Sequence, residues 1–133
     1  SQSAPVDWSF AKELDTVEFQ LEEPVSSRRS WIMEHDNRIF IPSGYMNSTV
    51  GKIWKHWPAY AEKNGNALLR IDGQVFEVHM QRTKEADVLT PILSELARKY
   101  MGVVPPIDDE VLAAMHQQVS SNNLWVFELV GRS

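Results

Sequence analysis

The residues of this chain that could carry binding chemistry concentrate in one aromatic stretch. Trp54 and Trp57 lie three positions apart in GYMNSTVGKIWKHWPAYAEKNG, residues 44–65, and Lys52 precedes them. Large aromatic side chains are mostly core residues, so the two rings could simply close one end of a core. They could equally line a site for a flat ligand. The sequence leaves both interpretations of each tryptophan open.

Cationic and hydrogen-bonding residues accompany the two tryptophans. Ser43 and Gly44 come at the predicted end of a strand, which offers backbone donors and a hydroxyl, and Lys52 adds a positive charge nearby. Arg28 and Arg29 begin another predicted strand of the same sheet. Donors and cations beside flat apolar surface suit a planar, phosphorylated ligand, which makes this set a candidate binding site.

Catalysis by a side chain has little support in the sequence. No nucleophile elbow, Walker loop or dinucleotide-binding GxGxxG motif occurs, and the chain has no Cys. Asp108 and Asp109 are explained as a helix cap with a favourable dipole contact. The histidines never pair at metal-ligand spacing, so we interpret them as surface or hydrogen-bonded polar residues and expect no metal site. They are His35, His56, His79 and His116.

The composition is that of one globular domain. The 133 residues are 43% hydrophobic and 23% charged, with a formal net charge of -5. This acidic balance argues against non-specific binding of nucleic acid, and no apolar run is long enough to span a membrane. The chain begins SQSAPVDW, without an initiator Met, so we expect a further segment before Ser1. Whether that segment is a signal peptide or a membrane anchor stays open.

Strand patterns dominate the first two thirds of the chain. TVEFQLE, residues 16–22, alternates apolar and polar residues as a half-buried strand does. RRSWIMEHDNRIFIPSG, residues 28–44, predicts a second and a third strand about a turn at Asp36–Asn37. NALLRIDGQVFEVHMQR, residues 66–82, predicts a hairpin about Asp72–Gly73. NLWVFELV, near the end of the chain, is apolar on both faces and predicts a strand covered from two sides.

Helical patterns separate these strands. A short helix is expected from Pro58 to about Asn64, closed by a left-handed Gly65. After Thr83 apolar residues recur at helical spacing, and Pro91 allows either a helix that begins there or a longer, kinked helix. Asp108 is expected to cap a second helix. Six strands with few helices predict a small, closed or partly closed barrel with a short helix after the third strand and two helices before the last.

The order of these elements resembles the split β-barrel flavin-binding superfamily, the pyridoxamine-phosphate-oxidase-like fold. The likeness covers roughly Val17 to Tyr100 and rests on SSRRSWIMEHDNRIFIPSG, on KIWKHWPAYAEKNGNALLRIDGQVFEVHMQR and on a helix ending LARKY. It is nearest the deazaflavin- or flavin-dependent nitroreductase-like branch and its uncharacterised relatives. It implies a six-stranded split barrel over residues 16–133, with residues 1–15 as an N-terminal extension.

The resemblance also implies a cofactor, either FMN or a deazaflavin, bound against the barrel of a homodimer. It would place Ser43 and Lys52 at the cofactor phosphate and Trp54 beside it. Arg28, Arg29 and Ser30 would lie along the strand that faces the ring. The opening APVDWSF is similar to relatives with a hydrophobic segment before the barrel, which would tether the protein to a membrane.

Two functions therefore remain open. The first is an oxidoreductase that binds a flavin-type cofactor and transfers hydride to or from a small organic acceptor. The second is a non-enzymatic barrel that has lost the cofactor and serves as a binding or assembly module; the long, aromatic loop at residues 44–65 favours it. Pyridoxamine-phosphate oxidation itself would need more basic phosphate ligands than this sequence contains.

Overall fold

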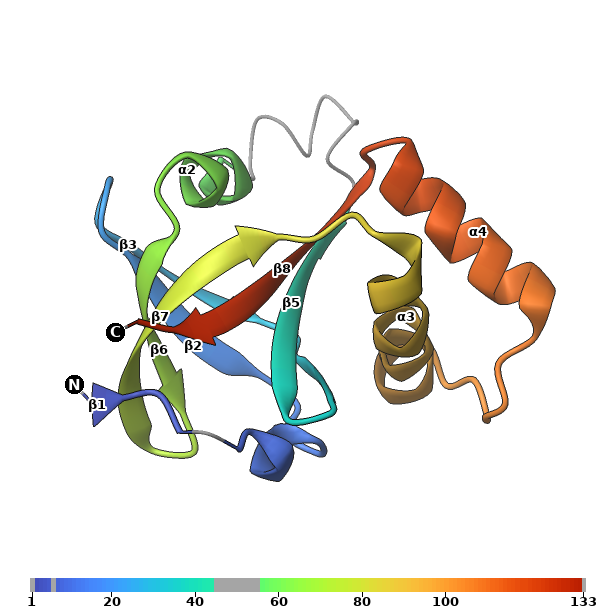
Figure 1. Cartoon of the computed structure of the whole chain (residues 1–133), viewed down its shortest axis with the longest axis horizontal. Helices are drawn as coiled ribbons and strands as arrows, with labels where there is room; N and C mark the ends of the chain where they lie inside the picture. The colour runs from blue at the N-terminus through green and yellow to red at the C-terminus, as the bar shows by residue number, and fades with distance from the viewer. Residues whose placement is uncertain (1, 6, 45–55, 133) are drawn as a thin grey trace.

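The computed structural model of the chain describes residues 2–5, 7–44 and 56–132 (Figure 1). These residues form eight strands, three α-helices and one 3₁₀ turn, η1, at Ser9–Ala11. The strands are β1 (Gln2–Ser3), β2 (Val17–Leu21), β3 (Ser26–Ser30), β4 (Met33–His35), β5 (Arg38–Gly44), β6 (Asn66–Ile71), β7 (Gln74–Arg82) and β8 (Leu124–Gly131). The helices are α2 (Trp57–Lys63), α3 (Ala86–Tyr100) and α4 (Asp109–Ser120).

Seven of the strands form one curled antiparallel sheet in the order β3-β2-β6-β7-β8-β5-β4, and β1 pairs in parallel with β7. The strands β3 and β4 lie at opposite edges of this sheet, although only Trp31 and Ile32 separate them in sequence. The two edges must therefore approach each other at that point. The expected six strands become seven because the second expected strand divides here, and each half pairs with a different edge.

The sequence contains a local reason for this division. Trp31, Ile32 and Met33 are three apolar residues in succession, which a strand with one solvated face does not use. Ile32 packs into the core inside the barrel, whereas Met33 packs into the core beneath the helices. The chain thus passes from one core to the other where the strand breaks.

Two tight turns confirm the turn predictions. Asp36 and Asn37 have φ of 51° and 64°, and Asp72 and Gly73 have φ of 51° and 74°. Two successive positive φ values are those of the hairpin turn whose twist matches its strands. The second turn sets the register of β6 on β7, so that Phe76, Val78 and Met80 are all buried as predicted.

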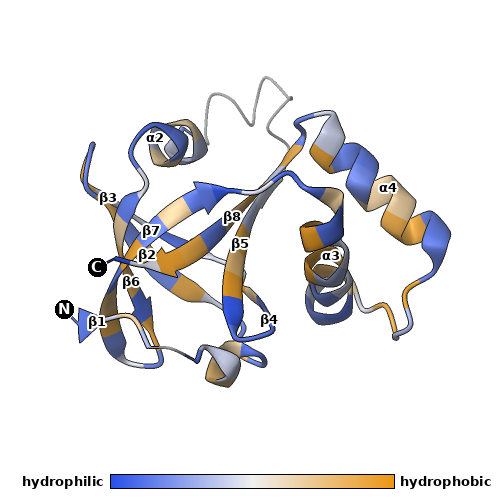
Figure 2. Cartoon of the chain, in the orientation of Figure 1, coloured by the Kyte–Doolittle hydropathy of each residue, from blue (hydrophilic) through white to orange (hydrophobic). Residues whose placement is uncertain are grey.

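Two hydrophobic cores lie on the two faces of the sheet. The inner core, within the barrel, is built on residues such as Phe19, Leu69 and Phe127. The outer core packs Phe40 and Val126 of the sheet against α3 and α4. Figure 2 shows apolar and polar stretches following one another along both helices. Because β8 contributes to both cores, its prediction as a strand covered on two sides is confirmed.

The helices settle three local expectations. α3 runs on through Pro91, so the longer of the two alternatives is correct. α4 begins after Asp108, as predicted, but the Asp108 side chain makes no capping hydrogen bond. The prediction of a left-handed Gly65 is wrong, since among the described glycines only Gly73 and Gly102 have positive φ. Gly65 is required instead because any Cβ there would collide with the Met80 carbonyl oxygen.

The N-terminal residues pack against the barrel. Trp8 is buried in the inner core, where its ring meets Phe76 edge-on at a centroid distance of 5.3 Å. Ala11 is fully buried in the same core. Within the described part of the chain, no helix has the length and apolar character needed to cross a membrane.

Candidate functional site

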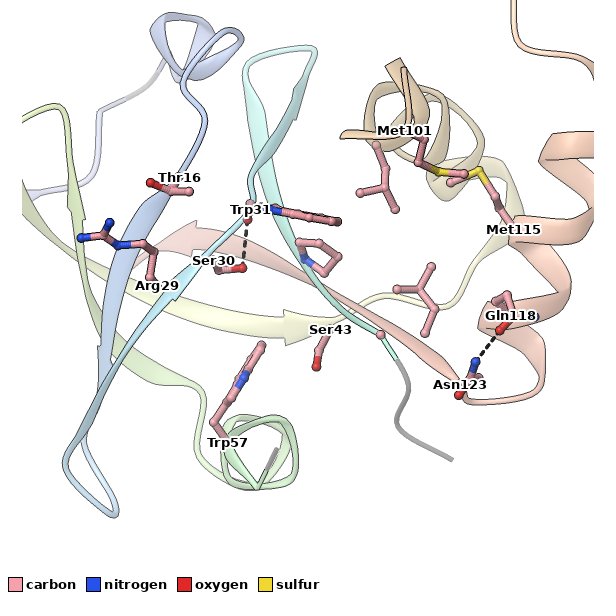
Figure 3. Close-up of a pocket in the computed structure, with 14 residues that line it drawn as sticks. Thr16, Arg29, Ser30, Trp31, Ser43, Trp57, Met101, Met115, Gln118 and Asn123 are labelled. Carbon is pink, nitrogen blue, oxygen red and sulfur yellow. Dashed lines mark hydrogen bonds between the residues drawn. The ribbon is translucent and has the colours of Figure 1, made fainter. Parts of the chain in front are cut away.

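A cavity of about 800 Å³ opens beside the point where β3 and β4 separate (Figure 3). Its walls come from the edge strand β3, the end of β5, the start of α2, the C-terminal end of α3, and α4. This volume lies in the range of small-molecule sites. The described lining residues are Thr16, Arg29, Ser30, Trp31, Pro42, Ser43, Gly44, Trp57, Leu96, Met101, Met115, Gln118, Asn123 and Leu124.

One end of the cavity is polar and carries a charge. The Arg29 guanidinium lies on β3 and donates a hydrogen bond to the Glu18 carboxylate on β2 at 2.9 Å. The neighbouring Ser30 hydroxyl donates to the Trp31 carbonyl at 3.0 Å, and Ser43 is a buried polar residue of β5. The antiparallel β2–β3 pairing sets Glu18 opposite Arg29, so the cation is directed by its strand partner.

Trp57 takes part in both the core and the cavity. Only 8% of this residue is exposed, and its ring meets Phe19 and Phe127 at centroid distances of 4.9 and 5.5 Å. It also lines the cavity. The two interpretations of this tryptophan are therefore compatible, because a ring that plugs the barrel end presents part of its surface to the site.

Trp31 forms a second aromatic wall. Its indole stacks on the phenol ring of Tyr100, with centroids 4.4 Å apart and planes 6° from parallel. The Tyr100 hydroxyl accepts a hydrogen bond from the Ile32 N–H at 3.0 Å and donates to the Asp15 carbonyl at 2.6 Å. Burial raises the pKa of this phenol. Trp31 is therefore held in place although 47% of it is exposed.

Lys99 binds backbone oxygens at and near the break between β3 and β4. Its ammonium donates to the Leu14 carbonyl at 2.6 Å and to the Ile32 carbonyl at 2.7 Å. Burial lowers the pKa of Lys99, because the charged amine is partly removed from water. Because the ammonium group is hydrogen-bonded to backbone oxygens, we assign Lys99 a structural role.

The other end of the cavity has no charged residue among its described lining residues and is mainly apolar. Met101 follows the last residue of α3, and Met115 lies on the inner face of α4. Figure 3 shows these two side chains pointing toward one another, opposite the side that holds Arg29 and Trp57. Gln118 and Asn123, which also line this side, are hydrogen-bonded to each other. The helix α4, whose role the sequence did not indicate, thus completes this wall.

Five of the eight sequence-predicted site residues line this one cavity: Arg29, Ser30, Ser43, Gly44 and Trp57. Arg28 does not line it; its guanidinium is exposed and donates to the Ser27 carbonyl at 3.0 Å. Lys52 and Trp54 lie outside the described residues. No group of His, Asp or Glu among the described residues could hold a metal ion.

Sequence reasoning missed Trp31, Met101 and Met115. A signal existed only for Trp31, since the apolar run at residues 31–33 interrupts the strand alternation. Both methionines were assigned to no site, because helical periodicity shows which face is buried but not which end of that face adjoins a cavity.

Comparison with solved structures places the fold. The chain superimposes on a conserved hypothetical protein of Mycobacterium tuberculosis with a TM-score of 0.66 and 15% identity, over 100% of this chain and 86% of that one. A candidate pyridoxamine 5'-phosphate oxidase of Listeria innocua gives 0.55 and 8%, over 90% and 85%. A candidate 5-nitroimidazole antibiotic resistance protein of Bacteroides thetaiotaomicron gives 0.52 and 12%, over 90% and 74%.

These neighbours have the split-barrel fold of pyridoxamine-phosphate-oxidase-like proteins, and this chain has it too. No protein-family model matches the sequence, and no curated protein matches it by sequence. At such low identities the likeness extends to the fold and not to the chemistry.

Proposed function

We propose that the cavity binds a flavin-type cofactor, FMN or a deazaflavin, and that the protein is an oxidoreductase acting on a small organic acceptor. One observation carries the proposal: residues predicted on three separate segments, Arg29–Ser30, Ser43–Gly44 and Trp57, line a single cavity. Apolar walls with a few polar groups at one end suit a flat ring that bears a phosphate. The shared fold supports the proposal, since one neighbour is described as a candidate pyridoxamine 5'-phosphate oxidase and another as a candidate 5-nitroimidazole antibiotic resistance protein.

The residues present fit such a ligand unequally. Trp57, which lines the cavity on the side of Arg29, offers an apolar wall for the cofactor ring. At the polar end, Arg29 would hold the phosphate with the hydroxyls of Ser30 and Ser43, and Lys52 is proposed as a second cation. When bound, the cofactor supplies the hydride chemistry. The protein's own residues bind it, orient it and limit the access of water.

A binding module without a cofactor is the alternative, and one observation favours it. Arg29 is the only cation among the described lining residues, and it is already paired with Glu18 at 2.9 Å. A phosphate must therefore compete with a carboxylate for this guanidinium. In this alternative the cavity takes an apolar small molecule and no redox reaction follows.

The deciding experiment compares FMN with riboflavin, which has the same ring but lacks the phosphate. Each is titrated into the protein while tryptophan fluorescence is recorded, and a deazaflavin is tested in the same way. We expect saturable quenching by FMN and weaker binding of riboflavin. Arg29→Ala should weaken FMN binding by about tenfold and leave riboflavin binding unchanged, because the lost contact is a charge-assisted hydrogen bond. Lys52→Ala should act in the same direction.

Arg28→Ala is the matched control, since Arg28 is the adjacent cation but does not line the cavity. Its FMN affinity should stay within about twofold of the unchanged protein. Absence of quenching by FMN, riboflavin and the deazaflavin would refute the cofactor proposal and favour the binding module. The homodimer and the membrane tether stay predictions; light scattering on the purified protein tests the first.

A further inference from the structure

The two ends of the cavity differ in chemistry, and the apolar end is a distinct part of the site. Of the described lining residues, the charged one and the three hydroxyl-bearing ones lie on or next to strands β2, β3 and β5. The apolar end, bounded by Trp31, Met101 and Met115, has no charged lining residue within the described ranges. A ligand group placed there would leave water without gaining an ionic partner, so a charged group would be disfavoured.

Trp31 gives this end a flat wall that is already in place. Tyr100 covers part of the indole by stacking, and its hydroxyl is held by the Ile32 N–H and the Asp15 carbonyl. Nearly half of Trp31 is still exposed, and it lines the cavity. Large exposed aromatic residues usually have freedom to reorient, which a bound ligand must remove. Stacking on Tyr100 already restricts the Trp31 ring before a ligand binds, which favours binding.

The opposite wall is adaptable. Met101 follows α3 and is more than half exposed, while Met115 reaches the cavity from α4. Unbranched thioether side chains adjust to different shapes and make favourable sulfur contacts with aromatic rings. A fixed indole on one side, with the exposed Met101 and the core residue Met115 on the other, would accept a flat ring of variable outline.

We propose that the space between Trp31, Met101 and Met115 is a subsite for a flat, uncharged aromatic ring, and that Tyr100 is the positioning residue for Trp31. This subsite is separate from the phosphate end at Arg29. It extends the proposed function by assigning a place and a chemical class to the second reactant. The subsite itself requires no cofactor, so it can be tested in the cofactor-free protein.

The test uses two probes that share one ring, naphthalene-2-methanol, which is neutral, and naphthalene-2-sulfonate, which is an anion. Each is titrated into protein labelled at the Trp indole N–H and the Met methyl groups, and NMR signals are assigned by substitution. We expect the neutral probe to shift the signals of Trp31, Met101 and Met115. The sulfonate should bind at least about tenfold more weakly, because it would bury its charge without a partner.

Substitutions separate stacking from general hydrophobic contact. Trp31→Leu should weaken binding of the neutral probe by about tenfold, whereas Trp31→Phe, which keeps a flat ring, should stay within about threefold. Tyr100→Leu should weaken binding and broaden the Trp31 indole signal before any probe is added, and Tyr100→Phe should do neither. Tyr60→Leu is the control, since Tyr60 is exposed on α2 and does not line the cavity.

Equal binding of both probes, or unchanged affinity in Trp31→Leu, would overturn the subsite. Unchanged affinity and an unchanged indole signal in Tyr100→Leu would overturn the positioning role; if that variant does not fold, the two Trp31 variants still decide the subsite. The same samples are titrated with FMN. Ring binding without FMN binding would refute the proposed function alone, and FMN binding without ring binding would refute the subsite alone.

Discussion

The rings of Trp31 and Tyr100 stack 4.4 Å apart and 6° from parallel, and this contact joins the break between β3 and β4 to the last residue of α3. Tyr100 also bonds the Ile32 N–H, and Lys99 bonds the Ile32 carbonyl at 2.7 Å. A strand that breaks leaves backbone groups without ladder partners, and buried groups of this kind need other partners. The end of α3 supplies them, so one helix end holds the break between β3 and β4 in place and shapes the cavity wall.

Removing only the Tyr100 hydroxyl should weaken this link between α3 and the strand break. Tyr100→Phe keeps the stacked ring but leaves the Ile32 N–H and the Asp15 carbonyl without the hydroxyl contact. We expect a loss of about 1–2 kcal/mol in the free energy of unfolding, measured with urea. Tyr60→Phe, at an exposed position on α2, should change it by less than about 0.5 kcal/mol. Equal effects of the two substitutions would show that the Tyr100 hydroxyl bonds add no stability.

The contribution of Tyr100 should depend on pH. Burial raises the pKa of its phenol above the ordinary 10.0, so the folded protein keeps this proton at a pH where the unfolded chain has lost it. Stability from the neutral phenol is then complete below pH 10.0 and is lost as the pH rises through the folded-state pKa.

The check is the difference in unfolding free energy between the unchanged protein and Tyr100→Phe. It should be constant at neutral pH and shrink above pH 10.0. Lys99 has the opposite effect, since its lowered pKa makes the free energy of unfolding rise as the pH approaches 10.5 from below. Because Lys99 is present in both proteins, its contribution largely cancels in the difference. A difference that grows above pH 10.0 would contradict the assignment.

Most of the fold could be predicted because its signals are local. Asp72–Gly73 between two alternating runs specifies a hairpin, and Phe76, Val78 and Met80 of β7 are buried as their spacing predicts. The division of the second expected strand could not be foreseen as readily. It depends on partners at two different sheet edges and on side chains from the end of α3, none of which is local in sequence.

Five of the fourteen described lining residues of the cavity could be predicted from the sequence. Four of these five, Arg29, Ser30, Ser43 and Gly44, lie on strands, where chemistry and position can both be inferred from the sequence. The apolar end comes from Trp31, Met101 and Met115, which look like ordinary core residues one at a time. Only tertiary packing shows that they face a cavity together, because periodicity identifies a buried face without saying what that face meets.

Gly65 provides a test of backbone packing. Its carbonyl accepts the Met80 N–H at 2.7 Å, and an added Cβ would collide with the Met80 carbonyl oxygen. Gly65→Ala should therefore lower the free energy of unfolding by about 1–3 kcal/mol. Gly44→Ala is the matched control, since a Cβ at Gly44 meets no atom of the described residues within 4 Å. If both substitutions leave urea midpoints unchanged, the strand and the end of α2 are less closely packed than described.

Arg82, whose side chain is only 9% exposed, should be more costly to replace than an exposed arginine. Its guanidinium lies 3.5 Å from the ring centroid of Trp125, with bonds of 3.0 Å to Glu62 and 2.9 Å to Asn122. It thereby ties α2 to the start of β8. Arg82→Met keeps the apolar stem but removes these contacts, and should cost about 1–3 kcal/mol of unfolding free energy. Arg28→Met, at an exposed strand position, should cost less than about 0.5 kcal/mol in the same urea titration.

The pairing of Arg29 with Glu18 leads to a prediction of improved binding. The carboxylate sits 2.9 Å from the only cation among the described lining residues, so it competes with any ligand phosphate and also repels it. Glu18→Gln keeps the size of the side chain and removes its charge. Both partners are exposed, so their attraction is worth at most about 1 kcal/mol, and removing it should strengthen FMN binding by about two- to fivefold. Riboflavin affinity should not change, because riboflavin carries no phosphate. Calorimetric titrations of both ligands check this, and a gain shared equally by FMN and riboflavin would show that Glu18 acts on the ring and not on the phosphate.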